Sequence, residues 1–362
     1  MPPVRTALVS DMHLGTLQEA DVLRQPEPRK RLAEALREAD RVVFLGDLVE
    51  LRDMPLARVL EVAAPILREL SAALAGKPVT VVPGNHDHRL IEPVIDRLRV
   101  DGAGPLELDW QGEPDGSPLA AGLARLMPDV ELRLAYPGLW VRSDVYALHG
   151  HYLDLHMTVP RVESILCQAL ARTMGPRASF SRPIDYELAL APLYSLSYWL
   201  AQRPAARTGR ANNLSRDVWT RVHGGDGRPS LGGFLLGRVA IPAGVAALNL
   251  TGVGPFSTDL SGAELLHSGQ RAIATALDNL GVESGHAIFG HTHRHGPLPG
   301  EEDEPGWRTP SGVQLWNTGS WYLESALMGH DRQASPYWPG GVIYVDDTGP
   351  PVVANVLRDV EL

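Results

Sequence analysis

The sequence predicts a mixed α/β fold that carries polar turns at the ends of short strands and contains a large, mainly helical insertion. Strand-like and helical patterns alternate up to about residue 100, which indicates a β-α-β series. Turns rich in Gly, Asp, His and Asn directly follow the strand-like runs. The interval 155–285 is rich in helical pattern, which predicts the insertion. With 362 residues and 44% hydrophobic content, the chain can bury a substantial core.

Five short strand-like runs each lead into one of these turns. The runs are Thr6–Ser10, Arg41–Leu45, Val79–Pro83, Val145–Leu148 and Ala287–Phe289. The turns contain Asp11 and His13; Asp47 and Glu50; Asn85, His86 and Asp87; His149 and His151; and His291 and His293. Loops at the carboxyl ends of strands in open α/β sheets converge on one edge. We therefore expect these polar side chains to lie close together.

The remaining pattern completes the core. Helices are predicted over Pro28–Ala39 and Pro55–Leu74, and the Gly- and Pro-rich segment 101–122 is predicted as a loop. Further strands are expected over Val130–Leu134, Leu139–Arg142, Val313–Trp316, Val342–Val345 and Val352–Val356, of which the last three should close a second sheet. The predicted organisation is therefore a core in two parts, 1–154 and 286–362, with 155–285 as a helical cap.

Helical spacing recurs through the cap. Predicted helices run from Val162 to Met174 and over Asp185–Gln202, Ser215–Val222 and Ser261–Leu280, where Ser261 and Glu264 form a capping box. The stretch Leu231–Phe256 carries one charge, Arg238, but several Gly residues and a Pro interrupt it, so we expect no transmembrane helix. Buried packing is the favoured interpretation of this stretch, and peripheral lipid contact is the alternative.

The residue types in the turns predict a site for two metal ions. Imidazole and carboxylate ligands together suit Mn, Fe or Zn, and the candidate ligands include no cysteine. A carboxylate can bridge two ions roughly 3.5–4 Å apart, a spacing at which both polarise one phosphoryl group and deprotonate a water between them. Asp47, in the middle turn, is the natural bridge, and Asn85 can supply a neutral carbonyl oxygen. Gly46, Gly84, Gly150 and Gly290 adjoin the candidates, where positive φ or close backbone approach is expected.

These turns, in this order, resemble those of the calcineurin-like metallophosphoesterase superfamily, and Trp316–Ser320 resembles its later motif. The resemblance implies a two-sheet β-sandwich flanked by helices with a dinuclear site at one edge. It implies that Asp11, His13, Asp47 and His293 surround one metal, and that Asp47, Asn85, His149 and His291 surround the other. It further implies that His86 contacts the phosphate or protonates the leaving oxygen. Manganese is the favoured metal, with iron and zinc as alternatives.

Within the superfamily, the sequence around these turns is loosely similar to the branch that contains UDP-2,3-diacylglucosamine hydrolase, a pyrophosphate-cleaving enzyme of lipid biosynthesis. That branch typically has Arg at the position of His86 and Asp at the position of His151. The resemblance implies that both positions lie beside the substrate, so this chain differs from the branch there. The branch implies a lipid-linked pyrophosphate or phosphodiester as substrate. General phosphodiesterase, nucleotide hydrolase and phosphomonoesterase activities are alternatives. A non-catalytic metal-binding scaffold that uses the apolar insertion to bind a protein or membrane is an alternative of another class.

Composition constrains partners and compartment. The net charge of −10 disfavours nucleic acid and anionic membranes as partners, although Arg203, Arg207, Arg210, Arg216 and Arg221 could meet a phosphate or lipid headgroup. The single cysteine, Cys167, cannot form an internal disulfide and is expected to be buried. The first strand starts near Val4, which leaves no room for a cleaved apolar leader, so a cytoplasmic location, with peripheral membrane contact as an option, is predicted.

Overall fold

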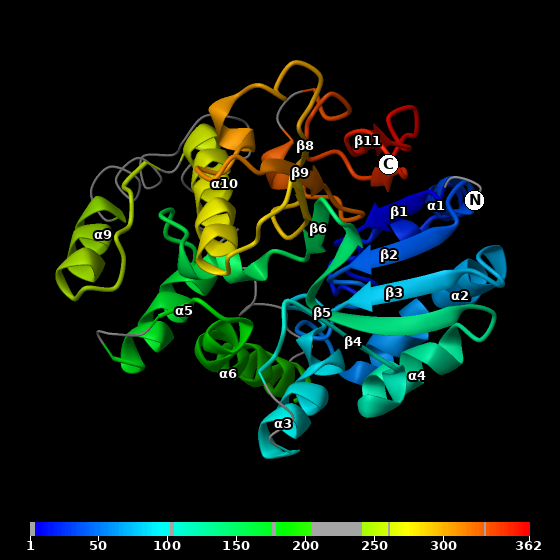
Figure 1. The fold of residues 1–362 in the computed structure, drawn as a ribbon, viewed down its shortest axis with the longest axis horizontal. Helices are drawn as coiled ribbons and strands as arrows, with labels where there is room; N and C mark the ends of the chain where they lie inside the picture. The colour runs from blue at the N-terminus through cyan, green and yellow to red at the C-terminus, as the bar shows by residue number, and fades with distance from the viewer. Residues whose placement is uncertain (1–3, 102–104, 176–178, 204–240, 260, 329–330) are drawn as a thin grey trace.

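The structure, a computed structural model, describes residues 4–101, 105–175, 179–203, 241–259, 261–328 and 331–362 (Figure 1). Within them the fold is mixed α/β, as predicted. The strands are β1 (Thr6–Val9), β2 (Arg41–Leu45), β3 (Pro78–Val82), β4 (Asp109–Gly112), β5 (Glu131–Arg142), β6 (Val145–Leu148), β7 (His286–Phe289), β8 (His295–Gly296), β9 (Gln314–Thr318), β10 (Gly341–Val345) and β11 (Val352–Asn355). The helices are α1 (Pro26–Arg37), α2 (Leu56–Ala73), α3 (Glu92–Asp101), α4 (Pro118–Leu126), α5 (Val162–Thr173), α6 (Pro183–Ala201), α9 (Ile241–Leu250) and α10 (Gly262–Asn279).

Across the described ranges the strands form one hydrogen-bonded ladder, β11-β10-β1-β2-β3-β5-β6-β7-β9-β8, with β4 paired to β5. The ladder contains two groups of parallel strands, β1-β2-β3-β5 and β6-β7-β9. The long strand β5 joins the groups, because its first half pairs with β3 and β4 and its second half pairs with β6. Parallel pairing within each group brings the carboxyl ends of its strands to one edge.

Alternating side chains of the strands enter different parts of the core. Ala7 and Val9 of β1 belong to a buried cluster that includes residues of α1, α2 and α4, whereas Leu8 belongs to a second cluster with Ile288 and Trp316. This alternation follows from the period of two in a strand. The second cluster thus contains side chains from both groups of parallel strands.

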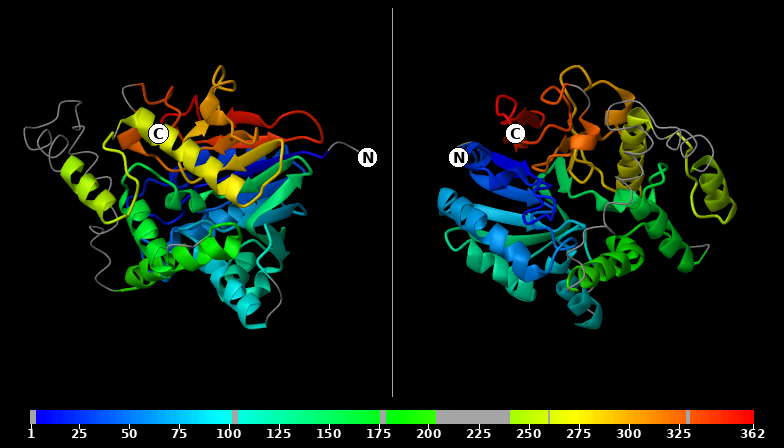
Figure 2. Two further views of the ribbon diagram at one scale, coloured as in Figure 1. Left: turned by 60° about the vertical axis from the view of Figure 1, so that its left-hand side comes forward. Right: turned by 180° about the vertical axis from the view of Figure 1, so that it is seen from behind.

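Three helices between residues 155 and 285 pack on the β6-β7-β9 group. A third buried cluster joins Tyr146 and Phe289 of these strands to Cys167 of α5, Tyr186 of α6 and Ile273 of α10. Figures 1 and 2 show α5, α6 and α10 beside these strands, with α9 outermost. The prediction that Cys167 is buried is confirmed, since its side chain has 0% exposure.

The helices of the insertion begin close to the residues that the sequence predicts. α5 and α6 agree with the predicted helices to within a few residues. Half of the predicted capping box of α10 is present: the Ser261 hydroxyl accepts from the backbone N–H of Glu264, whereas the Ser261 N–H donates to Asp259 Oδ1. The three-part division into 1–154, 155–285 and 286–362 stays a prediction.

Three expectations about the core were wrong. Segment 101–122 is not simply a loop: β4 pairs with β5, and α4 begins at Pro118, whose missing N–H is tolerated in the first helical turn. The two strands expected around residues 130–142 are one strand, β5. β10 and β11 do not extend the β6-β7-β9 group, because β10 pairs with β1 and β11 pairs with β10. Edge pairing depends on long-range contacts that local sequence does not specify.

Some predicted features lie outside the described residues. These are the helix over Ser215–Val222, the arginines at 207, 210, 216 and 221, and residues 231–240 of the apolar stretch. Among the described residues, which include α9 of that stretch, no helix is long and apolar enough to cross a bilayer.

A histidine near the start of the 155–285 interval makes stability depend on pH. Burial lowers the pKa of His156 to about 4, and its Nε2 lies 2.8 Å from the Tyr186 hydroxyl. The unfolded chain takes up this proton near pH 6.5, whereas the folded chain does so only near pH 4. The stabilisation is therefore complete above pH 6.5 and is lost as the pH falls toward 4.

His156→Gln should reduce this pH dependence, because the amide does not titrate but can still bond Tyr186. Urea unfolding at pH 7 and pH 4.5 measures the effect. We expect the wild type to lose about 2 kcal/mol more than the variant between these pH values. An equal loss in both proteins would contradict the assignment.

Candidate metal centre

The structure brings every predicted ligand to the ends of the parallel strands. β1 precedes Asp11 and His13, β2 precedes Asp47, and β3 precedes Asn85, while β6 and β7 lead to the remaining histidines. All of these side chains are buried or nearly so; they are Asp11, His13, Asp47, Asn85, His149, His291 and, with 17% side-chain exposure, His293.

The first group of candidate ligands contains Asp11, His13 and His293, whose ligand atoms all lie within 4.8 Å of one another. His293 Nε2 lies 3.4 Å from Asp11 Oδ1 and 3.2 Å from His13 Nε2. Asp11 Oδ1 is buried and has no hydrogen-bond partner among the described residues. A buried carboxylate oxygen without a donor is unfavourable unless a cation meets it, so this atom fits a metal ligand.

The second group contains Asp47, His149 and His291, with the same spacing limit of 4.8 Å. His149 Nε2 lies 3.3 Å from Asp47 Oδ2 and 3.3 Å from Asn85 Oδ1. Asp47 Oδ2 is also 3.7 Å from His13 Nε2 of the first group. Asp47 therefore lies between the two groups.

Hydrogen bonds identify which nitrogens could face an ion. His149 Nδ1 lies 2.9 Å from the Leu45 carbonyl oxygen, which only accepts, so Nδ1 carries the hydrogen. His13 Nδ1 likewise donates to Glu50 Oε2 at 3.0 Å. Both Nε2 atoms then face the Asp47 carboxylate. A lone pair facing an anionic oxygen needs a proton or a cation between them, and the donor set suits a divalent transition metal.

The electrostatics of the site agree with this geometry. Burial opposes a positive charge on His13, but the Glu50 hydrogen bond and the nearby carboxylates outweigh it and raise its pKa to about 9. Burial likewise opposes the charge of His149, yet Asp47 raises its pKa to about 10. Burial disfavours ionised Asp47, while His149 and His86 hold the pKa of that carboxyl well below its usual range. The carboxylates thus favour positive charge at this edge of the sheet.

The backbone of the turns is strained where the candidate ligands lie. Asp11, His13, Asp47, His291 and His293 all have φ between 46° and 64°, a left-handed conformation that is uncommon for residues with a Cβ. Such conformations persist where surrounding structure holds them, and they cluster at functional sites. The turns therefore orient these side chains at a cost in backbone conformational energy.

Three of the adjoining glycines show the close approach that the sequence predicts. A Cβ would lie 2.1 Å from His149 Nδ1 on Gly46, 2.3 Å from Asp47 Oδ1 on Gly84 and 2.5 Å from Asp11 Oδ2 on Gly290. Gly46 and Gly150 also have positive φ, at 92° and 107°. Side chains at the first three positions would displace candidate ligands.

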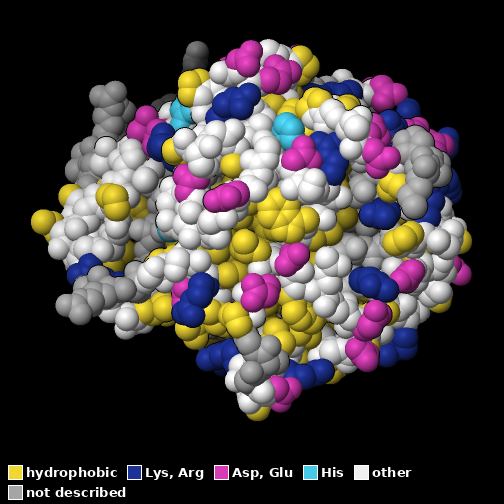
Figure 3. Space-filling view, viewed as in Figure 1, with side chains coloured by type: hydrophobic (Ala, Val, Ile, Leu, Met, Phe, Trp, Pro, Cys, Tyr) yellow, Lys and Arg dark blue, Asp and Glu magenta, His cyan; other side chains and the backbone are white. Residues whose placement is uncertain are grey.

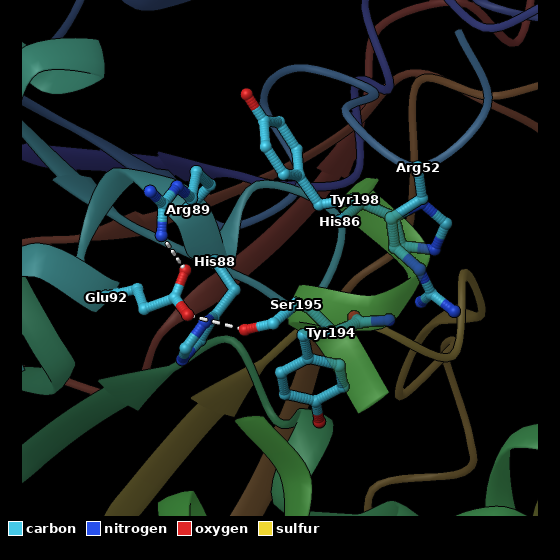
Figure 4. A pocket seen from close by; sticks show the side chains of 9 residues that line it. Arg52, His86, His88, Arg89, Glu92, Tyr194, Ser195 and Tyr198 are labelled. Atoms are coloured by element: carbon cyan, nitrogen blue, oxygen red, sulfur yellow. Dashed lines mark hydrogen bonds and ion pairs between the residues drawn. The ribbon is translucent and has the colours of Figure 1, made fainter. Parts of the chain in front are cut away.

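His86 lies at the edge of the two groups and reaches a pocket. Its Nδ1 donates to Glu50 Oε2 at 2.6 Å, and its backbone N–H donates to Asp47 Oδ1 at 2.8 Å. Its Nε2 is left to face another group. Figure 4 shows His86 and Arg52 beside side chains of α6 at this pocket, which is lined by Arg52, Asn85, His86, His88, Arg89, Glu92, Tyr194, Ser195 and Tyr198.

Sequence reasoning missed the carboxylates that orient the site. Glu50 binds both His13 and His86, and Asp154 Oδ1 lies 3.1 Å from His291 Nε2. Asp87 accepts from the backbone N–H groups of Gly84 and Leu48 and thereby joins two turns. Each stands within or just after a recognised turn, so proximity to a ligand motif was the available signal.

Glu50→Gln should weaken metal binding by about 10- to 100-fold, the usual effect of losing a carboxylate that orients a metal-binding histidine. One Glu50 oxygen accepts from His13 and His86, and the other accepts from the Arg52 backbone N–H at 2.9 Å. In either orientation of the glutamine amide, its NH2 group faces an N–H donor, so at least one of these hydrogen bonds is lost. Metal titration of the stripped protein measures the effect.

Glu69→Gln is the matched control, because Glu69 forms an exposed ion pair with Arg29 at 2.8 Å. This variant should bind metal as the wild type does. Equal affinities for Glu50→Gln and the wild type would exclude an orienting role for Glu50.

Comparison with known proteins gives one informative match. A family model for the calcineurin-like phosphoesterases matches residues 4–219. Two similar solved structures are a mutant cold-active protein tyrosine phosphatase, 13% identical over 98% of this chain and 78% of that chain with a TM-score of 0.32, and the cold-active enzyme of a psychrophile Shewanella sp., 14% identical over 94% and 75% with a TM-score of 0.27. Scores this low carry no argument. No curated protein matches the chain.

Proposed function

Because the chain belongs to the calcineurin-like phosphoesterase family, a family of metal-dependent phosphoester hydrolases, we propose that its polar turns form a dinuclear centre. Asp11, His13 and His293 would hold one divalent ion, Asn85, His149 and His291 would hold the other, and Asp47 would be shared by both. One observation carries the proposal: Asp47 Oδ2 lies within 4 Å of an Nε2 in each group of ligands, at 3.7 Å from His13 and 3.3 Å from His149.

Two divalent ions, when bound, polarise the phosphoryl group and lower the pKa of a water molecule. Side chains of the protein bind and protonate the substrate. His86, held by Glu50, places its free Nε2 at the pocket, where it protonates the leaving oxygen or contacts the phosphate. The neutral side chain of Asn85 limits negative charge beside the anionic substrate.

The finer architecture belongs to the same proposal. The two groups of parallel strands form the two layers of a β-sandwich, and the buried cluster that contains Leu8, Ile288 and Trp316 forms its interior. Residues 155–285 form a cap at the metal edge. Contact of α6 with the pocket beside His86 supports this placement.

The proposed substrate is a phosphodiester or pyrophosphate with an apolar or lipid substituent. α6 lines the pocket and also exposes large apolar side chains, with Trp199 at 60% and Leu196 at 56% exposure. Figure 3 shows hydrophobic side chains gathered on the lower part of this face, where Figure 1 places α5 and α6. Such surface suits an acyl chain or peripheral membrane contact. The net charge of −10 disfavours nucleic acid as substrate.

Metal reconstitution tests the proposal. Protein stripped by a chelator should not hydrolyse bis(p-nitrophenyl) phosphate, and added Mn²⁺ should restore hydrolysis with two ions per chain. Fe²⁺ and Zn²⁺ series identify the preferred metal. Bound metal without hydrolysis of any aryl diester would instead support the non-catalytic scaffold.

Matched diesters with short and long acyl chains test the lipid substituent. A surface that binds the chain should favour the longer ester by about 0.8 kcal/mol for each buried methylene. A catalytic efficiency independent of chain length would remove the lipid from the proposal and leave a general phosphodiesterase.

A further inference from the structure

Glu187 of α6 is a buried carboxylate that receives three hydrogen bonds. Its Oε1 accepts from the hydroxyls of Tyr136 at 2.5 Å and Tyr152 at 2.6 Å, and its Oε2 accepts from His88 Nε2–H at 2.8 Å. Each of these four side chains is at most 3% exposed. The predicted ligand set does not use any of them.

Two of the three donors come from segments that carry candidate ligands. His88 follows His86 by two residues, and Tyr152 belongs to the 3-10 helix His151–Leu155, which starts two residues after His149. Tyr136 lies on β5, and its oxygen is 3.1 Å from His151 Nε2. Because the Tyr136 hydrogen points to Glu187, His151 must donate to Tyr136. One carboxylate of the insertion thus connects to two of the ligand-bearing turns.

The face of α6 that buries Glu187 also reaches the pocket. Glu187, Tyr194 and Tyr198 are spaced by seven and four residues, so they share one side of the helix. Tyr194 and Tyr198 line the pocket with His86 (Figure 4). At 1.5 Å per residue, Glu187 and Tyr198 are about 16 Å apart along the helix. One face of α6 therefore connects Glu187 to two pocket residues.

The packing of α6 against its neighbours does not by itself require a charged side chain at Glu187. A buried carboxylate loses its hydration, and apolar side chains of similar volume often pack at least as stably. A fully bonded carboxylate does, however, specify one arrangement of its partners, since any shift leaves a buried donor or acceptor unpaired. Burial opposes ionisation of Glu187, but His88 and the two phenols outweigh it and lower its pKa.

We propose that Glu187 is a positioning residue that holds α6 against the metal-bearing turns, so that Tyr198 forms the wall that receives the second ester group of the substrate. This inference rests on the proposed function, because it requires the pocket beside His86 to hold part of a phosphodiester. It goes further in naming the residue through which the insertion sets substrate selectivity.

A double-mutant cycle tests the proposal. The Mn²⁺-loaded wild type, Glu187→Gln, Tyr198→Ala and the double variant are compared on phenyl and methyl p-nitrophenyl phosphate. The wild type should favour the phenyl ester. Each single variant should reduce that preference about tenfold, mainly by raising KM for the phenyl ester, and the double variant should show no further reduction. Metal content should stay the same.

Glu264→Gln is the matched control, because it removes a carboxylate of α10 that pairs with Arg271 at 2.6 Å. Its selectivity should equal that of the wild type. Additive effects in the double variant, equal losses on both esters, or a wild type with no preference would overturn the proposal.

A separate measurement distinguishes failure of the proposed function from failure of the positioning role of Glu187. If the wild type hydrolyses neither ester, the proposed function fails, and hydrogen exchange then decides the positioning role. Glu187→Gln should exchange faster than Glu264→Gln in residues 86–91 and 190–201, because the hydrogen bonds that join these segments are weakened. Equal exchange in both variants would overturn it.

Discussion

Asp47→Ala should lose both metal ions and reduce hydrolysis by about a thousandfold or more. Asp47 Oδ2 lies near an Nε2 of each ligand group, and Oδ1 accepts from the backbone N–H of His86. The substitution therefore removes the only carboxylate proposed to contact both ions, and it also frees the turn that carries His86. Elemental analysis and initial rates on bis(p-nitrophenyl) phosphate measure the two effects.

Asp359→Ala is the control for this prediction. It removes the same charge, but from an exposed ion pair with Arg31 at 2.7 Å, so metal content and rate should match the wild type. Two tightly bound ions and near-normal turnover in Asp47→Ala would exclude Asp47 as the bridge.

His86→Ala should slow hydrolysis of an alkyl ester by about a hundredfold or more and slow a nitrophenyl ester far less. An acid matters most when the leaving oxygen is strongly basic, and nitrophenolate leaves without protonation. Glu50 holds His86 through Nδ1, which leaves Nε2 for the substrate. Initial rates on matched alkyl and nitrophenyl diesters measure the difference.

His267→Ala replaces an exposed histidine of α10 and should leave both rates unchanged. Equal losses of rate on both esters in His86→Ala would assign His86 to phosphate binding. Little loss on either ester would leave it with only a structural role.

Local sequence was sufficient to predict the strands and turns that carry the candidate ligands. β1, β2, β3, β6 and β7 lie within a residue or so of the predicted runs. Each run is a short apolar segment followed at once by a Gly-containing or polar turn, and both signals are local. The residue types alone also indicated the chemistry, because mixed imidazole and carboxylate ligands are typical of divalent transition metals.

Strand pairing at the edges required the tertiary structure. β4 is a polar segment, and its pairing with β5 depends on the free edge that β5 presents. β10 follows β9 in sequence but pairs with β1, more than 300 residues away. Backbone hydrogen bonds between distant strands depend little on the types of the side chains. The hydrophobic periodicity of a strand therefore could not predict which edge of the sheet it joins.

The sequence by itself determined the types of the candidate metal ligands, the strand ends that carry them and the helices α5, α6 and α10. Only the tertiary structure decided which carboxylates orient those residues. Asp154 is 137 residues from His291, and Glu50 is 37 residues from His13. A ligand is recognisable from its own side chain and turn, whereas an orienting partner is defined by a distance of about 3 Å that folding alone creates.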